Sequence, residues 1–350
     1  MLPATTDDFF FRCLSPVELH RYSQTSKAAH NTVKSYLQRA FQLEHVLGPY
    51  FTSPQILEFR RLQFETGTFI SGSTALQFFD RTVYPESDLD LYVERRYHAP
   101  IALWLESIGY IYCPPEDSTP QSDTFTLAQA LSANARHGPQ MSINSEYAGP
   151  SFIYNFQKSG SSRRIQLILS QSDRPPIEML LNFHSTCVMN LITHDKAYSL
   201  YPRPTFEERR SLVLHSNTAE RERALKKYED RGWTIIKKIT KEETQNRRSS
   251  FHAGLRYLGD RKCWTLPLSP KLDMAVGQME THTWGLSYSR GLDVSMVYRI
   301  FGSTNLRFCY LVHPLFNTIV HDLARKAKSS DGKMDDALRL LLVTNKRYFV

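Results

Sequence analysis

The stretch FISGSTALQFFDRTVYPESDLDLYV, residues 69–93, carries a Gly-Ser pair and, further on, two aspartates one residue apart. The apolar runs at its two ends predict short β-strands, and TALQFFDR between them predicts a helix. Fourteen residues separate Ser73 from Asp88. We therefore expect the stretch to fold as a strand, a turn, a helix and a second strand.

Residues of these types suit phosphate and metal chemistry. Gly72 lets a ligand approach the backbone because it has no Cβ, and Ser73 or Thr74 can cap the following helix. The N-terminus of that helix would offer free N–H donors to a phosphate. Asp88 and Asp90 lie two apart on a strand, so their carboxylates share a face and can bind Mg²⁺ or Mn²⁺. An ordinary strand and helix with two surface acids is the alternative.

This arrangement resembles the nucleotidyltransferase superfamily of DNA polymerase beta. Its members carry Gly followed by Gly or Ser and then, after a spacer, Asp-x-Asp or Asp-x-Glu among apolar residues. The matching positions here are Ser71-Gly72-Ser73 and Asp88-Leu89-Asp90-Leu91, and the spacer lies at the long end of the family's range. The resemblance covers about residues 70–200.

The resemblance implies a nucleotide-binding domain with a mixed sheet flanked by helices. In such a domain Asp88 and Asp90 would be the catalytic residues and the ligands of Mg²⁺ or Mn²⁺. Gly72, Ser73 and Thr74 would hold a nucleoside triphosphate.

Catalytic members of the family take a third carboxylate from a neighbouring strand. The equivalent strand here is RRIQLILS, residues 163–170, which contains no acid and has Gln166 at that position. Asp173 and Glu178 follow nearby, outside the strand. Because a neutral amide cannot act as a base or supply negative charge to a second metal, we expect weak or lost transferase activity, as in a pseudoenzyme. An active metal-dependent nucleotidyltransferase is the competing hypothesis.

The N-terminal segment carries a second resemblance, to the F-box, over about residues 2–41. F-box motifs begin with Leu-Pro and continue through an apolar helix, a Leu-Ser step and a Ser-Lys before the last helix. The matching positions are Leu2-Pro3, Phe9-Phe10, Leu14-Ser15-Pro16, Glu18-Leu19 and Gln24-Thr25-Ser26-Lys27. Asp7-Asp8 and Arg12 depart from the pattern, because they interrupt the expected docking helix.

An F-box implies binding to a Skp1-type adaptor of a eukaryotic cullin ubiquitin ligase, with the core of the chain serving as a protein-recognition scaffold. The alternative is a helical cap that packs on the following domain. An exposed apolar face on residues 2–41 would favour the adaptor hypothesis, and burial of that face against the core would count against it.

The order of elements predicts an α+β protein with three regions. A helical F-box-like segment is expected at 1–65, and a nucleotidyltransferase-like mixed sheet with flanking helices at 66–202. A basic α+β region is expected at 203–350. KSGSS, residues 158–162, predicts a hairpin turn, and the basic residues that flank it could meet a triphosphate.

Three further local structures are expected. The apolar segment at 177–193 predicts a long buried helix with His184 and Cys187 on one face, and a partial metal site is the alternative. The region 113–150, rich in Pro, Ser and Asn, predicts a flexible insertion. Asn217 begins a capping-box-like pattern for the helix that follows it.

Composition narrows the class of protein. The chain has 350 residues, of which 41% are hydrophobic, as in globular proteins with a core. No run approaches the roughly 18 apolar residues of a membrane helix, and the N-terminus has acids where a signal peptide carries basic residues. The five cysteines are scattered and form no C-x-x-C pair. We therefore expect a soluble intracellular protein, cytoplasmic or nuclear, without a membrane partner.

The net charge of +8 is concentrated in one segment. Between Arg203 and Lys262 there are 16 Lys and Arg residues against 9 Asp and Glu residues. A basic surface of this kind would attract nucleotides, nucleic acid or phospholipid headgroups, so nucleic acid is a further candidate partner. A solvated helix face with mixed ion pairs is the alternative.

Overall fold

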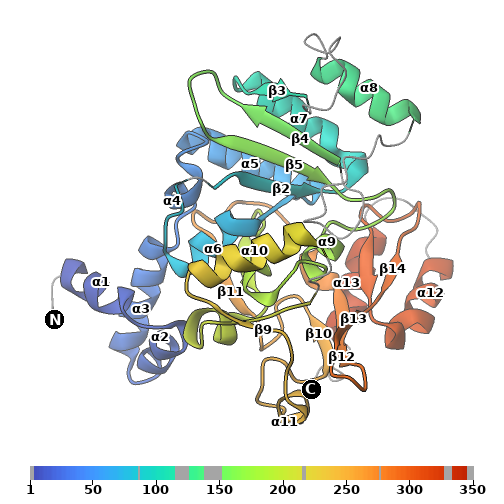
Figure 1. The fold of residues 1–350 in the computed structure, drawn as a ribbon. Coiled ribbons are helices and arrows are strands. Elements are labelled where there is room, and N and C mark those ends of the chain that lie inside the picture. The colour runs from blue at the N-terminus through green and yellow to red at the C-terminus, as the bar shows by residue number, and fades with distance from the viewer. Residues whose placement is uncertain are drawn as a thin grey trace.

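The computed structural model confirms the α+β class and is built around one mixed sheet of eight strands (Figure 1). It describes residues 4–85, 87–114, 126–137, 152–214, 218–275, 277–326 and 333–344. In spatial order the strands of this sheet are β11 (Trp264–Pro267), β7 (Lys196–Ser199), β6 (Asn190–Ile192), β1 (Phe69–Ser71), β2 (Leu89–Val93), β5 (Arg164–Leu169), β4 (Phe152–Gln157) and β3 (Ile111–Cys113). The sheet thus joins strands of the predicted nucleotidyltransferase-like region to one strand from beyond residue 203.

Residues 69–93 fold as a strand, a helix and a second strand, as predicted. β1 and β2 pair antiparallel, and α6 (Gly72–Asp80) connects them. β2 pairs parallel with β5, and the predicted hairpin joins β4 to β5. The apolar residues of β2 and β5 are fully buried, which explains their near-continuous hydrophobic runs.

Helices at the N-terminus form a separate small unit at one end of the molecule (Figure 1). They are α1 (Ala4–Arg12), α2 (Pro16–Ser23) and α3 (Lys27–Ala40), followed by α4 (Glu44–Leu47) and α5 (Ser53–Thr66). Ser15 caps α2 in a capping box with Glu18, as the Ser-Pro pair predicts. Phe11, Leu19 and Val33 belong to the core of α1–α3, whereas α4 and α5 belong to the main core.

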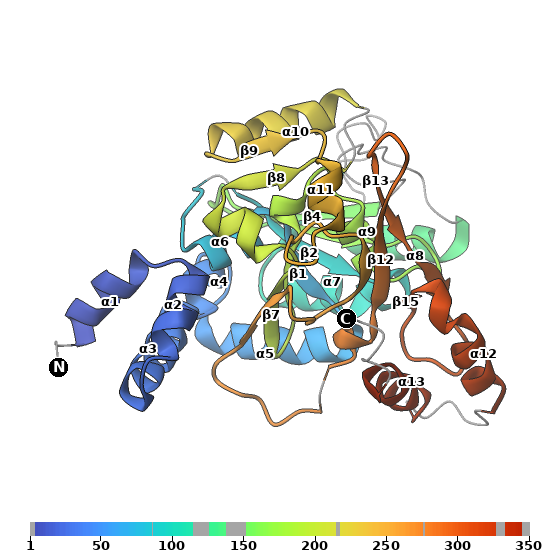
Figure 2. The same ribbon diagram turned by 90° about the horizontal axis from the view of Figure 1, so that it is seen from below.

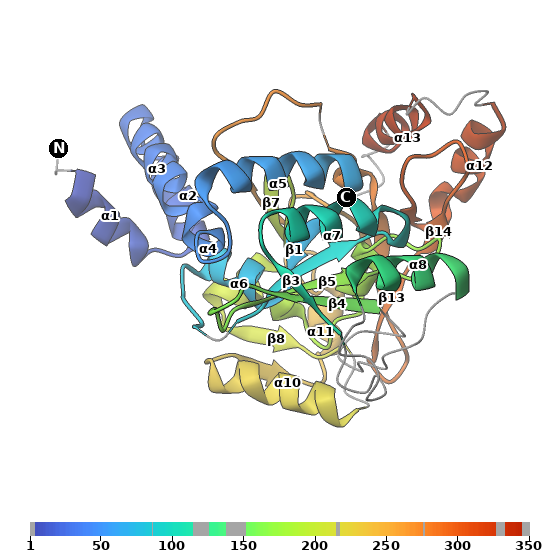
Figure 3. The same cartoon turned by 90° about the horizontal axis from the view of Figure 1, so that it is seen from above.

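Helices cover both faces of the main sheet. Besides α5 and α6 they are α7 (His98–Ser107), α8 (Leu127–His137), α9 (Ile177–Leu181) and α10 (Ala219–Asp230). Figures 2 and 3 show α5 and α10 on opposite sides of the sheet. Because both faces are covered, the side chains at the centre of the sheet are shielded from water.

Three smaller sheets accompany the main one. Their strands are β8 (Arg210–Leu212) with β9 (Thr234–Ile236), β10 (Gly254–Tyr257) with β12 (Thr283–Tyr288) and β13 (Val294–Val297), and β14 (Arg299–Phe301) with β15 (Tyr310–Val312). The remaining helices of the described residues are α11 (Lys241–Gln245), α12 (Asn317–Lys326) and α13 (Lys333–Thr344). β14, β15, α12 and α13 share a second hydrophobic core, which includes Phe316 and Leu338.

Two local predictions are wrong in detail. The segment 177–193 is not one helix, because α9 ends at Leu181 and the chain then turns into β6. The segment is apolar throughout, and such a run does not distinguish a buried helix from a buried strand. The amphipathic periodicity of residues 32–47 predicts one continuous helix. The helix breaks after Ala40 instead, where Phe41 leaves the helical conformation to enter the main core.

Two other predictions involve residues outside the described part of the chain. Most of the expected insertion at 113–150 lies there, as does Asn217. The residue that caps α10 in the structure is Thr218, whose hydroxyl accepts the N–H of Arg221. Within the described residues, no helix is long and apolar enough to cross a bilayer.

Candidate functional site

Gly72 and Asp90 are in direct contact where β1 meets α6. Antiparallel pairing sets Ser71 opposite Asp90, and Gly72 follows with a left-handed φ of 64°. A Cβ added to Gly72 would overlap the Asp90 carboxylate. The position thus requires glycine both for its backbone conformation and for the close approach of Asp90.

Asp88 lies just before β2 and is partly exposed, with 27% of its side chain accessible. Its Oδ2 lies 3.5 Å from a guanidinium nitrogen of Arg164. Burial raises the pKa of the Asp88 carboxyl, and the charge of Arg164 partly opposes that shift. The hydroxyl of Thr74 donates to the Asp88 carbonyl at 3.1 Å, which ties the first turn of α6 to the start of β2.

The predicted helix cap is placed differently. Ser71 is the N-cap of α6, and its hydroxyl donates to the carbonyl of Asn190 instead of capping the helix. Ser73 and Thr74 lie inside the first turn and are buried. The prediction that either of them caps α6 is therefore wrong, because the N-cap is Ser71 and the helix begins at Gly72.

A row of polar side chains crosses three strands beside Asp90. The parallel register sets Gln166 of β5 opposite Asp90, and Asn155 of β4 lies opposite Gln166. The Gln166 amide donates to Asn155 Oδ1 at 3.4 Å. Asp173 lies in the turn after β5, and Glu178 binds Arg174 with a carboxylate oxygen at 2.5 Å from the guanidinium. The β5 side chain opposite Asp90 is thus the neutral amide of Gln166 and not a carboxylate.

Basic side chains of the β4–β5 hairpin lie on the side of Asp88. Arg163 lies over the ring of Tyr50 at 5.7 Å, and Lys158 lies over the ring of Tyr110 at 4.7 Å. Burial raises the pKa of Tyr50, Arg163 lowers it, and the charges of Asp88 and Asp90 raise it further. The Tyr50 hydroxyl also donates to the carbonyl of Ser87 at 2.5 Å, so Tyr50 connects Arg163 of the hairpin to the residue before Asp88.

His184 and Cys187 do not share a helical face, because the chain is irregular between α9 and β6. Both side chains are buried. A hydrogen bond of 2.8 Å joins His184 Nδ1 to the Ser185 hydroxyl, and burial lowers the pKa of His184 to about 4. Among the described residues, no three His, Cys, Asp or Glu side chains gather as a metal site.

The N-terminal helices expose part of their aromatic surface. Phe9 is 75% exposed, Phe10 53% and Tyr22 40%, although Phe11 beside them is buried. Asp8, which departs from the F-box pattern, forms an ion pair with Arg39 of α3 at 2.5 Å. This acid therefore links α1 to α3.

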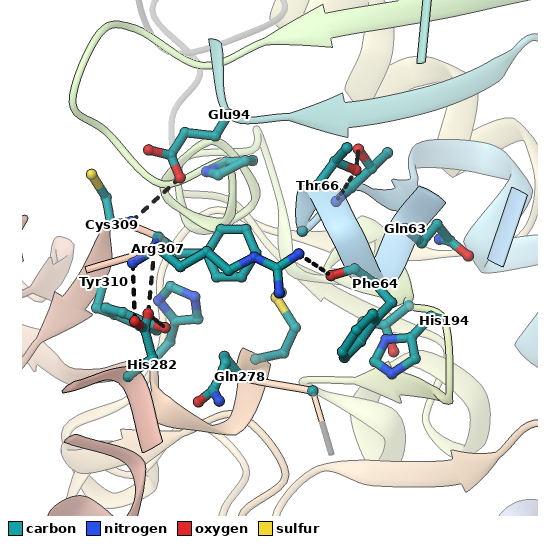
Figure 4. Close-up of a pocket in the computed structure, with 18 of the residues that line it drawn as sticks. Gln63, Phe64, Thr66, Glu94, His194, Gln278, His282, Arg307, Cys309 and Tyr310 are labelled. Atoms are coloured by element: carbon teal, nitrogen blue, oxygen red, sulfur yellow. Dashed lines mark hydrogen bonds between the residues drawn. The ribbon is translucent and has the colours of Figure 1, made fainter. Parts of the chain in front are cut away.

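A separate cavity of about 190 Å³ lies at the other end of β2, between α5 and the C-terminal elements (Figure 4). Glu94 follows β2 there and accepts the backbone N–H of Cys309 at 3.3 Å. Asp335 accepts the backbone N–H of Arg307 at 2.9 Å. These buried acids join segments that are far apart in the sequence. No local sequence motif contains both partners, so the sequence alone does not reveal these contacts.

Comparison of the chain with protein-family models, with curated proteins and with solved structures finds no match. The resemblance to nucleotidyltransferases therefore rests on the residues of this chain alone. The same holds for the resemblance to the F-box.

Proposed function

We propose that the chain binds a nucleoside triphosphate together with Mg²⁺ or Mn²⁺ between the Gly72 turn and the pair Asp88 and Asp90. We propose further that its nucleotidyl transfer is weak or lost. The register of three adjacent strands carries the proposal, because it sets Ser71 opposite Asp90 and Asp90 opposite Gln166. A turn suited to phosphate thus lies beside two carboxylates suited to a cation.

The oxygen ligands that these side chains offer fit one hard cation. The carboxylates of Asp88 and Asp90 would hold it, and phosphate oxygens and water would complete its coordination. When bound, such a cation would withdraw charge from the phosphate oxygens. Gln166 could offer only a neutral oxygen, which supports the proposal that a second cation and a general base are missing.

Arg164 supports a role in phosphate binding. It lies 3.5 Å from Asp88, and half of its side chain is exposed, so it is free to reorient. A cation bound at Asp88 would displace this weak ion pair. The released guanidinium would then be available to the triphosphate, together with Lys158 and Arg163 of the same hairpin.

A thermal-shift titration with each of the four nucleoside triphosphates, with Mg²⁺ or Mn²⁺, tests the proposal. A ligand at about 100 times its Kd should add roughly 2.7 kcal/mol to the free energy of unfolding. The shift should require the metal and should disappear in the double variant Asp88→Asn/Asp90→Asn. Asp273→Asn, at an exposed acid elsewhere in the chain, is the matched control and should retain the shift.

Absence of a metal-dependent shift with all four nucleotides would refute the proposed site. So would an equal shift in the double variant. An assay of pyrophosphate release with the same proteins would test the second half of the proposal, since efficient release would show that Gln166 does not prevent transfer.

One observation favours a second candidate function, docking to a Skp1-type adaptor. The exposed rings of Phe9 and Phe10 form the kind of apolar surface that partners cover. The variant Phe9→Ser/Phe10→Ser should abolish complex formation in size-exclusion chromatography with a purified adaptor. Val83→Ser removes an equally exposed apolar side chain outside α1–α3 and should leave the complex intact. Failure of the unmodified chain to form a complex would exclude this candidate.

A further inference from the structure

A groove of about 910 Å³ separates the N-terminal helices from the C-terminal half of the chain. α2 and α3 form one wall, and the other consists of residues 202–207, 247–250 and 261–269. Figure 2 shows α2 and α3 at the edge of the molecule, outside the main sheet. β11, which lines the groove, lies four strands from β2. At about 4.8 Å per strand, the groove is roughly 19 Å from the proposed nucleotide site.

Cations dominate the rim of this groove. Among the lining residues that the structure describes, Glu207 is the single carboxylate. Arg203 forms an ion pair with Glu208 at 2.9 Å, whereas no carboxylate of the described residues pairs with the other five. The six cations are Lys34, Arg203, Arg247, Arg248, Arg261 and Lys262. Such an excess of positive charge attracts an anionic partner.

Lys262 is a partly buried cation on the rim of the groove. Its ammonium donates to the carbonyl of Ser249 at 3.1 Å. The pKa of Lys262 is lowered to about 8, mainly by burial; the charge of Arg256 acts in the same direction, and that of Asp260 opposes it. An anion in the groove would stabilise the charged form of this ammonium.

The floor of the groove is apolar. Val17 and Leu37 are partly exposed in it, and Phe41 and Leu266 are buried beneath. Trp264 packs edge-on against Phe41 with 5.3 Å between ring centroids. Among the lining Phe, Tyr and Trp residues that the structure describes, it is the one that stays partly exposed. Single-stranded nucleic acid stacks its bases on several aromatic rings, so this largely aliphatic floor favours apolar amino-acid side chains instead.

We infer that the groove binds a peptide segment in which acidic and apolar side chains alternate at helical spacing. The acidic side chains pair with the cations of the rim, and the apolar ones cover Val17, Leu37 and Trp264. This combination is that of an amphipathic helix in a hydrophobic groove, with charge complementarity selecting the partner. The inference does not depend on the proposed nucleotide site.

Fluorescence anisotropy with the full chain tests the inference. The probe is a labelled synthetic peptide with leucines at helical spacing among glutamates, called the leucine peptide. The first comparison ligand, the serine peptide, has serine in place of each leucine. The second is a labelled oligothymidylate. Arg247→Ser/Arg248→Ser should weaken binding of the leucine peptide about tenfold, since each exposed pair contributes up to about 1 kcal/mol. Lys237→Ser/Lys238→Ser removes two exposed cations outside the groove and should leave the affinity unchanged.

The leucine peptide should bind more tightly than both comparison ligands, and its affinity should fall as salt rises. Equal binding of the serine peptide would overturn the inference, because the floor would then contribute nothing. Tighter binding of the oligothymidylate, equal loss in the two double variants or no binding of the leucine peptide would overturn it as well. Circular dichroism of all the variants establishes that each is folded.

Discussion

At the scale of the residue, the contact between Gly72 and the Asp90 carboxylate decides how the candidate site is built. Asp90 can approach the start of α6 because position 72 has no Cβ. Each of these residues is recognisable in the sequence, and the strand, turn and helix around them were predicted correctly. The contact itself depends on the pairing of Ser71 with Asp90, which a sequence motif does not specify.

Gly72→Ala should lower stability and also weaken nucleotide binding, because the new methyl group would push Asp90 away. Gly160→Ala is the matched control, since Gly160 also has a positive φ but has open space around its Cβ position. Both variants bear the strain of a left-handed alanine, so their difference measures the contact. In urea unfolding, Gly72→Ala should be about 1–3 kcal/mol less stable than Gly160→Ala, as for an overpacked core. Equal stability would show that Asp90 moves aside without cost.

Gln166 offers a gain-of-function prediction at the same scale. Gln166→Asp would place a third carboxylate opposite Asp90 and should increase the affinity for Mn²⁺ at least about tenfold, as added negative charge does in metal sites. Isothermal titration calorimetry measures the change. Asn155→Asp, one strand farther from Asp90, is the control and should produce a smaller gain. A larger gain from Asn155→Asp would mean that the cation does not lie at Asp90.

At the scale of elements, hydrophobic periodicity predicts the extent of some helices correctly and of others wrongly, and the reason differs for each. The helix α10 has one apolar stripe and a capping side chain, and the sequence pattern predicts a helix over 219–231, close to the observed Ala219–Asp230. The segment 177–193 is apolar on all sides, so its sequence did not show where α9 ends and β6 begins. Likewise α3 ends at Ala40 because Phe41 and Leu43 enter the main core, a tertiary effect that local periodicity does not contain.

Arg81 attaches the N-terminal helices to the end of α6. Its guanidinium donates to the Tyr36 hydroxyl at 2.5 Å and to the carbonyls of Phe11 and Leu14 at 3.3 and 3.2 Å. In Arg81→Ala, amides of α1–α3 should exchange with deuterium at least about tenfold faster, because hydrogen bonds to a charged group contribute about 1.5–3 kcal/mol. Amides of β1 and β2 should keep their protection.

Arg12→Ala is the control for this measurement, since Arg12 is an exposed arginine of the same helical unit. It should leave exchange in α1–α3 unchanged. Faster exchange throughout the main sheet of Arg81→Ala would contradict the prediction, because Arg81 would then support the whole fold and not one attachment.

At the scale of the whole molecule, the unpredicted features are those made by distant segments. The basic groove combines residues 16–41 with residues 202–207 and 247–269, and the cavity near Glu94 combines α5 with elements beyond residue 275. The sequence shows the excess of positive charge after residue 203, but it does not show that α2 and α3 supply an apolar wall opposite it. Composition therefore indicates the sign of the charge that we infer for the partner, but not the shape of the groove.

Buried histidines in different parts of the molecule make the whole fold sensitive to acid. Burial lowers the pKa of His184 to about 4 and that of His282 to about 3. Between those values and the ordinary 6.5, the unfolded chain binds more protons than the folded one, so stability falls as pH falls below about 6.5. From pH 7 to 5.5 the two histidines together should remove roughly 2 kcal/mol from the free energy of unfolding.

His282→Asn separates this effect from that of the carboxyls. His282 Nδ1 accepts the backbone N–H of Leu311 at 3.0 Å, and the carbonyl oxygen of asparagine can accept the same bond. The carboxyls of Asp88 and Glu94 have raised pKa values, so their titration makes the fold more stable as pH falls, opposite to the histidines. The measurement therefore compares the free energy of unfolding of the variant with that of the unmodified chain at each pH. The stability that the variant loses relative to the unmodified chain should shrink by about 1 kcal/mol between pH 7 and 5.5. Urea unfolding at each pH measures it, with exposed His20→Asn as control. A loss that stays constant with pH would show that His282 binds protons as readily in the folded state as in the unfolded chain.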